Sequence, residues 1–100
     1  MVVTIFRNRV RPEVREEYAQ WMARMSQLAK SMPGYISHKG FAAEDGERVT
    51  IIEFESEEAL RAWSVNSEHV EAKKKGRKDF YLEYRVLVCD VLRESASPKK

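Results

Sequence analysis

The chain has little cysteine, glycine or proline and no long apolar stretch. Its 100 residues include one cysteine, Cys89, four glycines and three prolines. A single cysteine cannot form an internal disulfide, which excludes a disulfide-stapled secreted framework. No apolar segment approaches the ~20 residues of a membrane span, and residues 1–5 lack the basic and apolar regions of a signal peptide. We therefore expect a cytoplasmic protein with no membrane segment.

A strong charge of one sign is also missing. The formal net charge is +2, too small to indicate a nucleic-acid or anionic-membrane partner. Residues 39–42, Lys-Gly-Phe-Ala, resemble the start of an RNA-binding motif. They fall on the second predicted strand, however, and the third offers no exposed aromatic pair for stacking bases. The sequence therefore predicts no nucleic-acid partner.

Motifs for metals and nucleotide cofactors are absent as well. His38 and His69 are the only histidines, and neither has cysteines or carboxylates at ligand spacing. The glycines form neither a dinucleotide-binding nor a phosphate-binding pattern, and no Ser-His-Asp arrangement or nucleophile elbow is visible. We expect no resident metal or cofactor.

The periodicity of apolar residues predicts six elements in the order β-α-β-β-α-β. The predicted strands span residues 2–10, 35–43, 47–55 and 80–92, with a hairpin turn at 44–46. The first predicted helix starts near Pro12 and is stopped by Pro33-Gly34. The second follows the N-cap Ser56, breaks near Asn66-Ser67 and ends at Gly76. This order is typical of a ferredoxin-like α+β domain with an antiparallel sheet, here over residues 1–94, with a frayed tail at 95–100.

The predicted strands are apolar on both sides. In the last strand Tyr84 and Val86 lie on one face, and Leu87 and Cys89 on the other. Right-handed crossovers place both helices on one face of the sheet, so the second face needs another cover. A second copy packed face to face around a two-fold axis supplies one. We therefore expect a homodimer, although a different partner would satisfy the same pattern.

Three side chains are candidates for a site, each with a structural alternative. Asn8 follows Thr4 and Phe6 on one strand face, where it either finds a backbone partner or projects between sheet and helices. Trp63 is either core or a ligand platform. His69 is either a surface histidine at a helix start or a base whose pKa lies near neutrality.

The densest charge cluster is the basic run at residues 73–78, Lys-Lys-Lys-Gly-Arg-Lys. Cations at a helix C-terminus complement the helix dipole, which is the structural interpretation. Alternatively, the run forms a positive rim that draws anionic ligands toward a pocket.

Several segments together resemble the antibiotic biosynthesis monooxygenase (ABM) family of dimeric α+β barrels. They are Met32-Pro33-Gly34-Tyr35, residues 54–60 leading into Trp63, Ser67-Glu68-His69 and the closing strand at 84–88. The resemblance covers nearly the whole chain. It implies a dimeric barrel and, in members that oxidise aromatic polyketide or quinol-like compounds, chemistry without flavin or metal.

The resemblance also implies site roles. The substrate would be a small electron-rich aromatic that is deprotonated and then itself reduces dioxygen. The protein would supply a dry pocket, hydrogen bonds to the oxyanion and a proton acceptor. Asn8 would bind the oxyanion, Trp63 would form the pocket wall and His69 would be the base. The predicted substrate-binding residues are Phe6, Trp21, Met25 and Tyr84.

Two other functions stay open. A second branch of the family cleaves haem, and Asn8 and Trp63 match two of its positions. Its iron-binding histidine corresponds to Lys73 here, and lysine is a poor haem ligand unless deprotonated. The third reading is a dimeric ligand-binding or stress-related module without turnover, which no motif in the sequence excludes.

Overall fold

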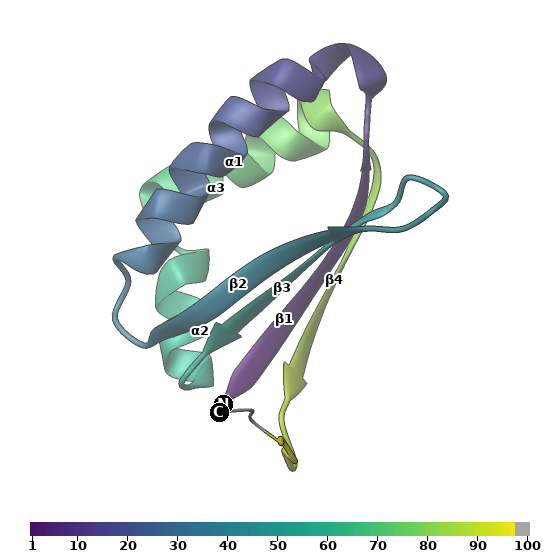
Figure 1. Ribbon diagram of the computed structural model, residues 1–100. Helices are drawn as coiled ribbons and strands as arrows, with labels where there is room; N and C mark the ends of the chain where they lie inside the picture. The colour runs from purple at the N-terminus through teal and green to yellow at the C-terminus, as the bar shows by residue number, and fades with distance from the viewer. Residues whose placement is uncertain (98–100) are drawn as a thin grey trace.

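The computed structural model describes residues 1–97 and contains the predicted order of elements (Figure 1). It is an α+β protein of the ferredoxin-like kind, with an antiparallel sheet and helices, as the sequence predicted. The strands are β1 (Val2–Val10), β2 (Tyr35–Ala42), β3 (Arg48–Phe54) and β4 (Tyr81–Asp90). The helices are η1 (Pro12–Val14), α1 (Arg15–Lys30), α2 (Glu57–Ser64), α3 (Ser67–Lys75) and the π-helical turn η2 (Gly76–Phe80).

The sheet has the strand order β2-β3-β1-β4, and all neighbouring strands are antiparallel. The N-terminal strand β1 is therefore central. Residues directly opposite in an antiparallel ladder share a face, so Val2, Thr4, Phe6 and Asn8 lie on the same face as their partners. That face is toward the helices, because Val2 belongs to the main core cluster. Its buried members are Val2, Met25, Ala29, Phe54, Leu60 and Trp63.

The helix starts follow from capping chemistry. Pro12 lies in the first turn of η1, which leads directly into α1. The Ser56 hydroxyl accepts a hydrogen bond from the Ala59 backbone N–H at 3.1 Å and so caps α2. The Asn66 side-chain oxygen caps α3 by accepting from the N–H groups of Glu68 and His69. The break predicted at Asn66-Ser67 is therefore a true boundary between two helices.

Gly76 does not end the helix in the way the sequence suggested. Its backbone is right-handed helical, with φ −59°, and the chain continues through η2. The glycine is needed for space, because a Cβ here would lie 2.5 Å from the Tyr81 ring. Since η2 takes up Phe80, the last strand begins at Tyr81 instead of Phe80 and ends at Asp90.

Both faces of the sheet carry partly uncovered apolar side chains in the single chain. On the face away from the helices, Ile5, Ile51 and Leu87 are half-buried. The predicted second copy would cover this face and stays a prediction. The helix-facing side of β4 was expected to be covered, yet Val86 and Val88 are 53% and 55% exposed. β4 is an edge strand, and α3, which leads into it through η2, diverges from it with distance from that turn (Figure 1).

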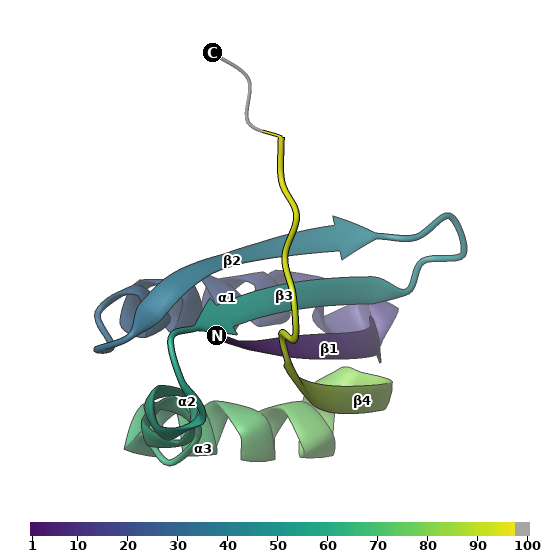
Figure 2. The ribbon, with the colours of Figure 1, turned by 90° about the horizontal axis from the view of Figure 1, so that it is seen from below.

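The chain leaves the sheet after β4 as an extended segment. Within residues 1–97 no helix has the length and apolar character needed to cross a membrane. Residues 91–97 form neither helix nor strand; in the view of Figure 2 they run from the end of β4 past β1, β3 and β2. Residues 98–100 of the predicted tail lie outside the described residues.

Candidate functional site

Asn8 is the most unusual polar side chain of the described structure. It lies on the helix-facing side of β1 and is 1% exposed. Neither its oxygen nor its nitrogen has a hydrogen-bond partner among residues 1–97. Thr4 lies on the same face and is 8% exposed. Its buried hydroxyl also has no hydrogen-bond partner among residues 1–97. Buried polar groups in folded proteins are almost always hydrogen-bonded. The unpaired side chains of Thr4 and Asn8 therefore indicate that a hydrogen-bonding partner is missing.

Aromatic side chains surround this part of β1. The ring of Phe6 meets Tyr81 edge-on at 5.4 Å, and Tyr18 meets Tyr81 at 5.8 Å. The ring of Tyr84 lies 6.4 Å from Phe6 and belongs to the same group. The polar side chain of Asn8 therefore lies in a part of the structure that is rich in aromatic side chains.

Two phenols of this group, the buried Tyr18 and the half-buried Tyr81, stay neutral. Burial raises the pKa of Tyr18, an effect that Tyr81, the Arg48 cation and Asn8 partly offset. Burial also raises the pKa of Tyr81, and the neighbouring Tyr18 adds to the shift. Asn8 lies close enough to Tyr18 to act on its pKa, although no well-formed hydrogen bond joins them among the described residues. Neutral phenols can donate hydrogen bonds, so this region offers hydroxyl and amide donors suited to an oxyanion.

Trp63 and His69 form a second feature. Trp63 is 6% exposed and packs in the main core cluster. The His69 ring stacks on it, with ring centres 3.9 Å apart and planes 11° apart. The Nδ1 atom of His69 lies 3.0 Å from the Trp63 carbonyl oxygen. Because a carbonyl only accepts, Nδ1 carries the proton and donates, which leaves Nε2 as the acceptor of the ring.

His69 is neutral at physiological pH. The pKa of His69 is lowered to about 4, mainly by burial; the hydrogen bond to the Trp63 carbonyl opposes this shift, and the nearby Lys73 cation contributes to it. No hydrogen bond or ring contact within residues 1–97 joins His69 to Asn8, Tyr18 or Tyr81. The structure therefore does not bring the three predicted catalytic residues into one cluster: Trp63 and His69 are together, and Asn8 lies with Tyr18 and Tyr81.

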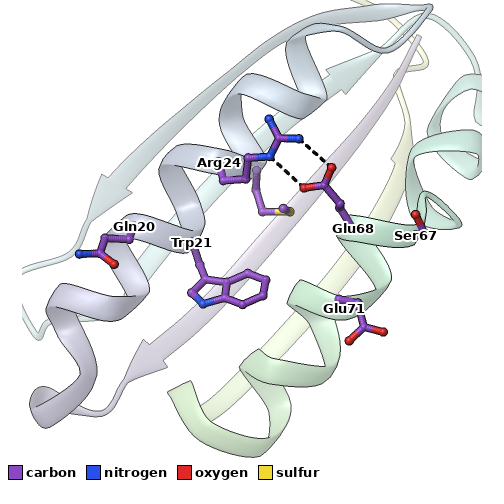
Figure 3. A pocket seen from close by; sticks show the side chains of 7 residues that line it. Gln20, Trp21, Arg24, Ser67, Glu68 and Glu71 are labelled. Atoms are coloured by element: carbon purple, nitrogen blue, oxygen red, sulfur yellow. Dashed lines mark hydrogen bonds and ion pairs between the residues drawn. The ribbon is translucent and has the colours of Figure 1, made fainter.

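A groove of about 540 Å³ runs between α1 and α3 (Figure 3). The Arg24 guanidinium donates to both carboxylate oxygens of Glu68, at 2.8 and 2.7 Å, and spans it. The indole of Trp21 points from α1 toward α3. The groove is lined by Gln20, Trp21, Arg24, Met25, Ser67, Glu68 and Glu71. Two predicted pocket residues, Trp21 and Met25, are thus in this groove, whereas Phe6 and Tyr84 belong to the aromatic group near Asn8.

Lys73, at the position where the haem-cleaving branch has its histidine, is engaged within the fold. Its Nζ donates to the Ser64 carbonyl at 2.8 Å, next to the carbonyl that accepts from His69. Both side chains therefore satisfy the last carbonyls of α2. Burial lowers the pKa of Lys73, and Arg77 adds to the shift. In the described part of the chain, no group of three or more His, Cys, Asp or Glu side chains is arranged to hold a metal ion.

Sequence reasoning missed Thr4, Tyr18 and Tyr81 as site residues. Tyr18 is one of the buried residues of α1, and its position in the sequence does not distinguish it from an ordinary core residue. Thr4 precedes Asn8 by four residues on one strand face, and this spacing was the available signal. The sequence around Tyr81 contains no signal for a site residue, because the position of Tyr81 depends on the π-helical turn that precedes it.

The element order and the antiparallel sheet define a class, the small ferredoxin-like α+β domains. Within that class, the family model described as antibiotic biosynthesis monooxygenase matches residues 1–75. The chain therefore belongs to the antibiotic biosynthesis monooxygenase family, as the sequence motifs indicated.

Individual relatives agree with this membership. The uncharacterised YqjZ protein of Bacillus subtilis is 34% identical over 77 residues, which are 77% of this chain and 68% of YqjZ. The structure of Rv0793 from Mycobacterium tuberculosis superposes with a TM-score of 0.83 at 21% identity, covering 95% of this chain and 98% of that one. SnoaB, a cofactor-independent oxygenase from Streptomyces nogalater, superposes with a TM-score of 0.78 at 16% identity, covering 93% and 94%. At these identities the two structures establish the shared fold.

Proposed function

We propose that the protein is a cofactor-independent monooxygenase that oxidises a small, electron-rich aromatic or quinol-type substrate with dioxygen. The observation that carries the proposal is the Asn8 amide, which is buried, unpaired within residues 1–97 and surrounded by aromatic rings. Family membership and the fold shared with SnoaB support the same chemistry. A homodimer is part of the proposal, since it would cover the open sheet face.

The proposed reaction needs only the substrate and dioxygen. Loss of a proton gives an electron-rich enolate or phenolate, which reduces dioxygen and combines with it. One oxygen atom ends in the product carbonyl, and the other leaves as water with the substrate's hydrogens. The protein lowers the barrier by stabilising the substrate oxyanion in a dry site.

Asn8 would donate its amide N–H to that oxyanion, and the hydroxyls of Tyr18 and Tyr81 lie beside it as further donors. Trp63 as a pocket wall and His69 as proton acceptor stay predictions. His69 offers a neutral Nε2, but a pKa of about 4 makes it a weak base. A substrate with an acidic phenol or enol would need less help from such a base.

Oxygen uptake with anthrones, quinols and simple phenols tests the activity. We expect uptake with at least one anthrone or quinol, and a drop of about 100-fold in rate for Asn8→Leu, as for loss of an oxyanion donor. Gln27→Leu, the same kind of change at an exposed amide on α1, is the control. No uptake with any substrate, or equal rates in both variants, would contradict the proposal.

The predicted homodimer is tested separately by sedimentation equilibrium. Burial of the half-exposed Ile5, Ile51 and Leu87 between two copies should give a dimer at micromolar concentration. Ile5→Lys places a charge on that face and should shift the protein to monomer. A stable wild-type monomer would rule out the face-to-face arrangement.

The contacts of Lys73 bear on the haem alternative. Its Nζ is bound to the Ser64 carbonyl, so we expect no Soret shift when haem is titrated into the wild type. The variant Lys73→His introduces an imidazole at the position where the haem-cleaving branch has its histidine. Its haem titration is compared with that of the wild type. A Soret shift with the wild type would favour haem degradation over the proposed oxidation.

A ligand-binding module without turnover is supported by one observation: Asn8 and His69 share no contacts. Ligand binding without oxygen consumption would favour it.

A further inference from the structure

A second group of polar side chains lies between α1 and the edge strand β2, and the proposed oxidation does not use it. His38 of β2 is opposite Ile52 of β3, and Ile52 is opposite Thr4 of β1. His38 therefore faces the helices, in the row of Thr4. That row is four residues, or about 13 Å, along β1 from the row of Asn8. The group is thus separate from the candidate site described above.

A β-bulge turns the Tyr35 side chain to the same face as His38. The pairing of β2 with β3 shifts after Tyr35, where Ile36 is the extra residue. Tyr35 is opposite Phe54, a core residue on the helix-facing side. On a regular strand, residues three apart point to opposite faces. The bulge is therefore what brings Tyr35 and His38 together, and bulges are frequent beside active sites.

The His38 ring lies between two hydroxyl groups. Its Nδ1 is 2.6 Å from the Tyr35 hydroxyl oxygen, and its Nε2 is 2.8 Å from the Ser26 Oγ on α1. A neutral imidazole has one N–H and one acceptor nitrogen. With the proton on Nδ1, Tyr35 accepts from the ring and Ser26 donates to Nε2. A hydroxyl paired with a neutral histidine that a third group orients is the arrangement of an activated nucleophile.

The surroundings of Ser26 suit this chemistry. Ser26 and His38 are both half-buried, so the hydroxyl can be reached from solvent. Burial lowers the pKa of His38, and the Lys30 cation adds to the shift. The ring is therefore neutral near pH 7 and can accept a proton. Lys30 is four residues after Ser26 on the same side of α1, and its charge would stabilise the oxyanion formed when Ser26 attacks a carbonyl.

We propose that Ser26 is a nucleophile that takes an acyl group from small activated esters, with His38 as its base and Tyr35 orienting the ring. The Ser26 Oγ attacks the carbonyl carbon while its proton passes to Nε2. The bond from that carbon to the leaving oxygen then breaks, and the leaving group departs with the proton from Nε2. Water that gives a proton to the same nitrogen hydrolyses the acyl-serine to the carboxylic acid and restores Ser26. This activity goes beyond the proposed oxidation and does not depend on it.

The probe for this activity is p-nitrophenyl acetate, added to the full chain. We expect a stoichiometric burst of p-nitrophenol, and peptide mass spectrometry should find the acetyl group on Ser26. Ser26→Ala should remove the burst, and His38→Gln should slow it about 100-fold, as for loss of a general base. Ser31→Ala is the control, because the exposed Ser31 hydroxyl donates to the Leu28 carbonyl. This variant should keep the burst of the wild type.

The positioning role of Tyr35 is tested by nitrogen NMR of the His38 ring, whose signals are assigned by their loss in His38→Gln. We expect the proton on Nδ1 in the wild type. In Tyr35→Phe, where the ring at position 35 can still pack against Phe54, the proton should move to Nε2. A purely structural role of Tyr35 would not change the tautomer. Acetylation of Ser26 should slow in the same variant.

Three results would overturn the inference. They are acetylation confined to lysines, equal bursts in Ser26→Ala and Ser31→Ala, and a wild-type His38 that carries its proton on Nε2. Each would mean that the three side chains only connect α1 to β2. None of these measurements involves oxygen uptake, so the inference and the proposed oxidation can fail separately.

Discussion

The two ends of the layer between sheet and helices differ in how completely they are packed. At one end, the packed end, Trp63 belongs to the core cluster and stacks on His69. The Nδ1 atom of His69 is hydrogen-bonded to the Trp63 carbonyl. At the other end Asn8 is just as buried, yet its amide is unpaired within the described chain. The two ends are alike in burial and differ in whether their buried polar groups are hydrogen-bonded.

The largest loss of stability is expected for Trp63→Ala, at the packed end. Removing a buried tryptophan should lower the free energy of unfolding by about 3–5 kcal/mol. Trp21→Ala, at the half-buried tryptophan of the α1–α3 groove, is the control and should cost less than half as much. The measurement is denaturant unfolding of both variants. Equal losses would show that the groove is as tightly packed as the core.

Gly76→Ala tests how the aromatic end is built. A Cβ at Gly76 would lie 2.5 Å from the Tyr81 ring, so Tyr81 or η2 must shift, at a cost of about 1–3 kcal/mol in unfolding free energy. Gly40→Ala is the control, because the nearest atom to its new Cβ is the Thr50 hydroxyl oxygen at 4.0 Å. Tyrosine fluorescence should also change in the first variant only. An unchanged stability of Gly76→Ala would contradict the close packing.

His69 makes the stability of the packed end depend on pH. Burial lowers its pKa from 6.5 to about 4, so the folded chain prefers the neutral ring. The stability that this gives is complete above about pH 6.5 and is lost as the pH falls toward 4. Allowing for partial exposure of the ring, we expect a loss of about 2 kcal/mol over this window.

The control for this pH dependence is His69→Phe, which keeps the stacking on Trp63 but cannot titrate. Its unfolding free energy should fall less between pH 6.5 and 4. What remains would come from groups common to both proteins, including His38, whose pKa burial also lowers. If the unfolding free energies of the wild type and His69→Phe changed equally with pH, the His69 ring would be exposed to solvent and the prediction would be wrong.

The smallest effect is expected at the open end. Asn8→Leu removes an unpaired amide from a buried position and should raise the free energy of unfolding by about 1 kcal/mol. A stabilising change that also slows oxygen uptake is typical of a residue kept for function. Thermal unfolding provides the measurement. A destabilised variant would mean that Asn8 has a structural partner, which would remove the contrast between the two ends.

Strand and helix positions were predictable because they depend on local patterns. The β1 bounds, the Ser56 cap and the break at Asn66 follow from β-branched residues, a capping hydroxyl and a capping amide, which act over a few residues. Gly76 shows the limit of such reasoning. Its effect depends on Tyr81, and only the turn of the chain through η2 brings the two together. The candidate site shows it too, since Asn8, Trp63 and His69 were correctly placed on their elements but do not form one cluster.

The element order, the ferredoxin-like fold and the family could all be predicted from the sequence, because periodicity, caps and turns act locally and the motifs can be compared residue by residue. Which side chains meet could be seen only in the folded chain. The fold places the Asn8 amide close to Tyr18, stacks His69 on Trp63 and leaves Tyr84, Val86 and Val88 exposed. These outcomes depend on how α1, α3 and the sheet pack, and packing joins residues that are far apart in the chain.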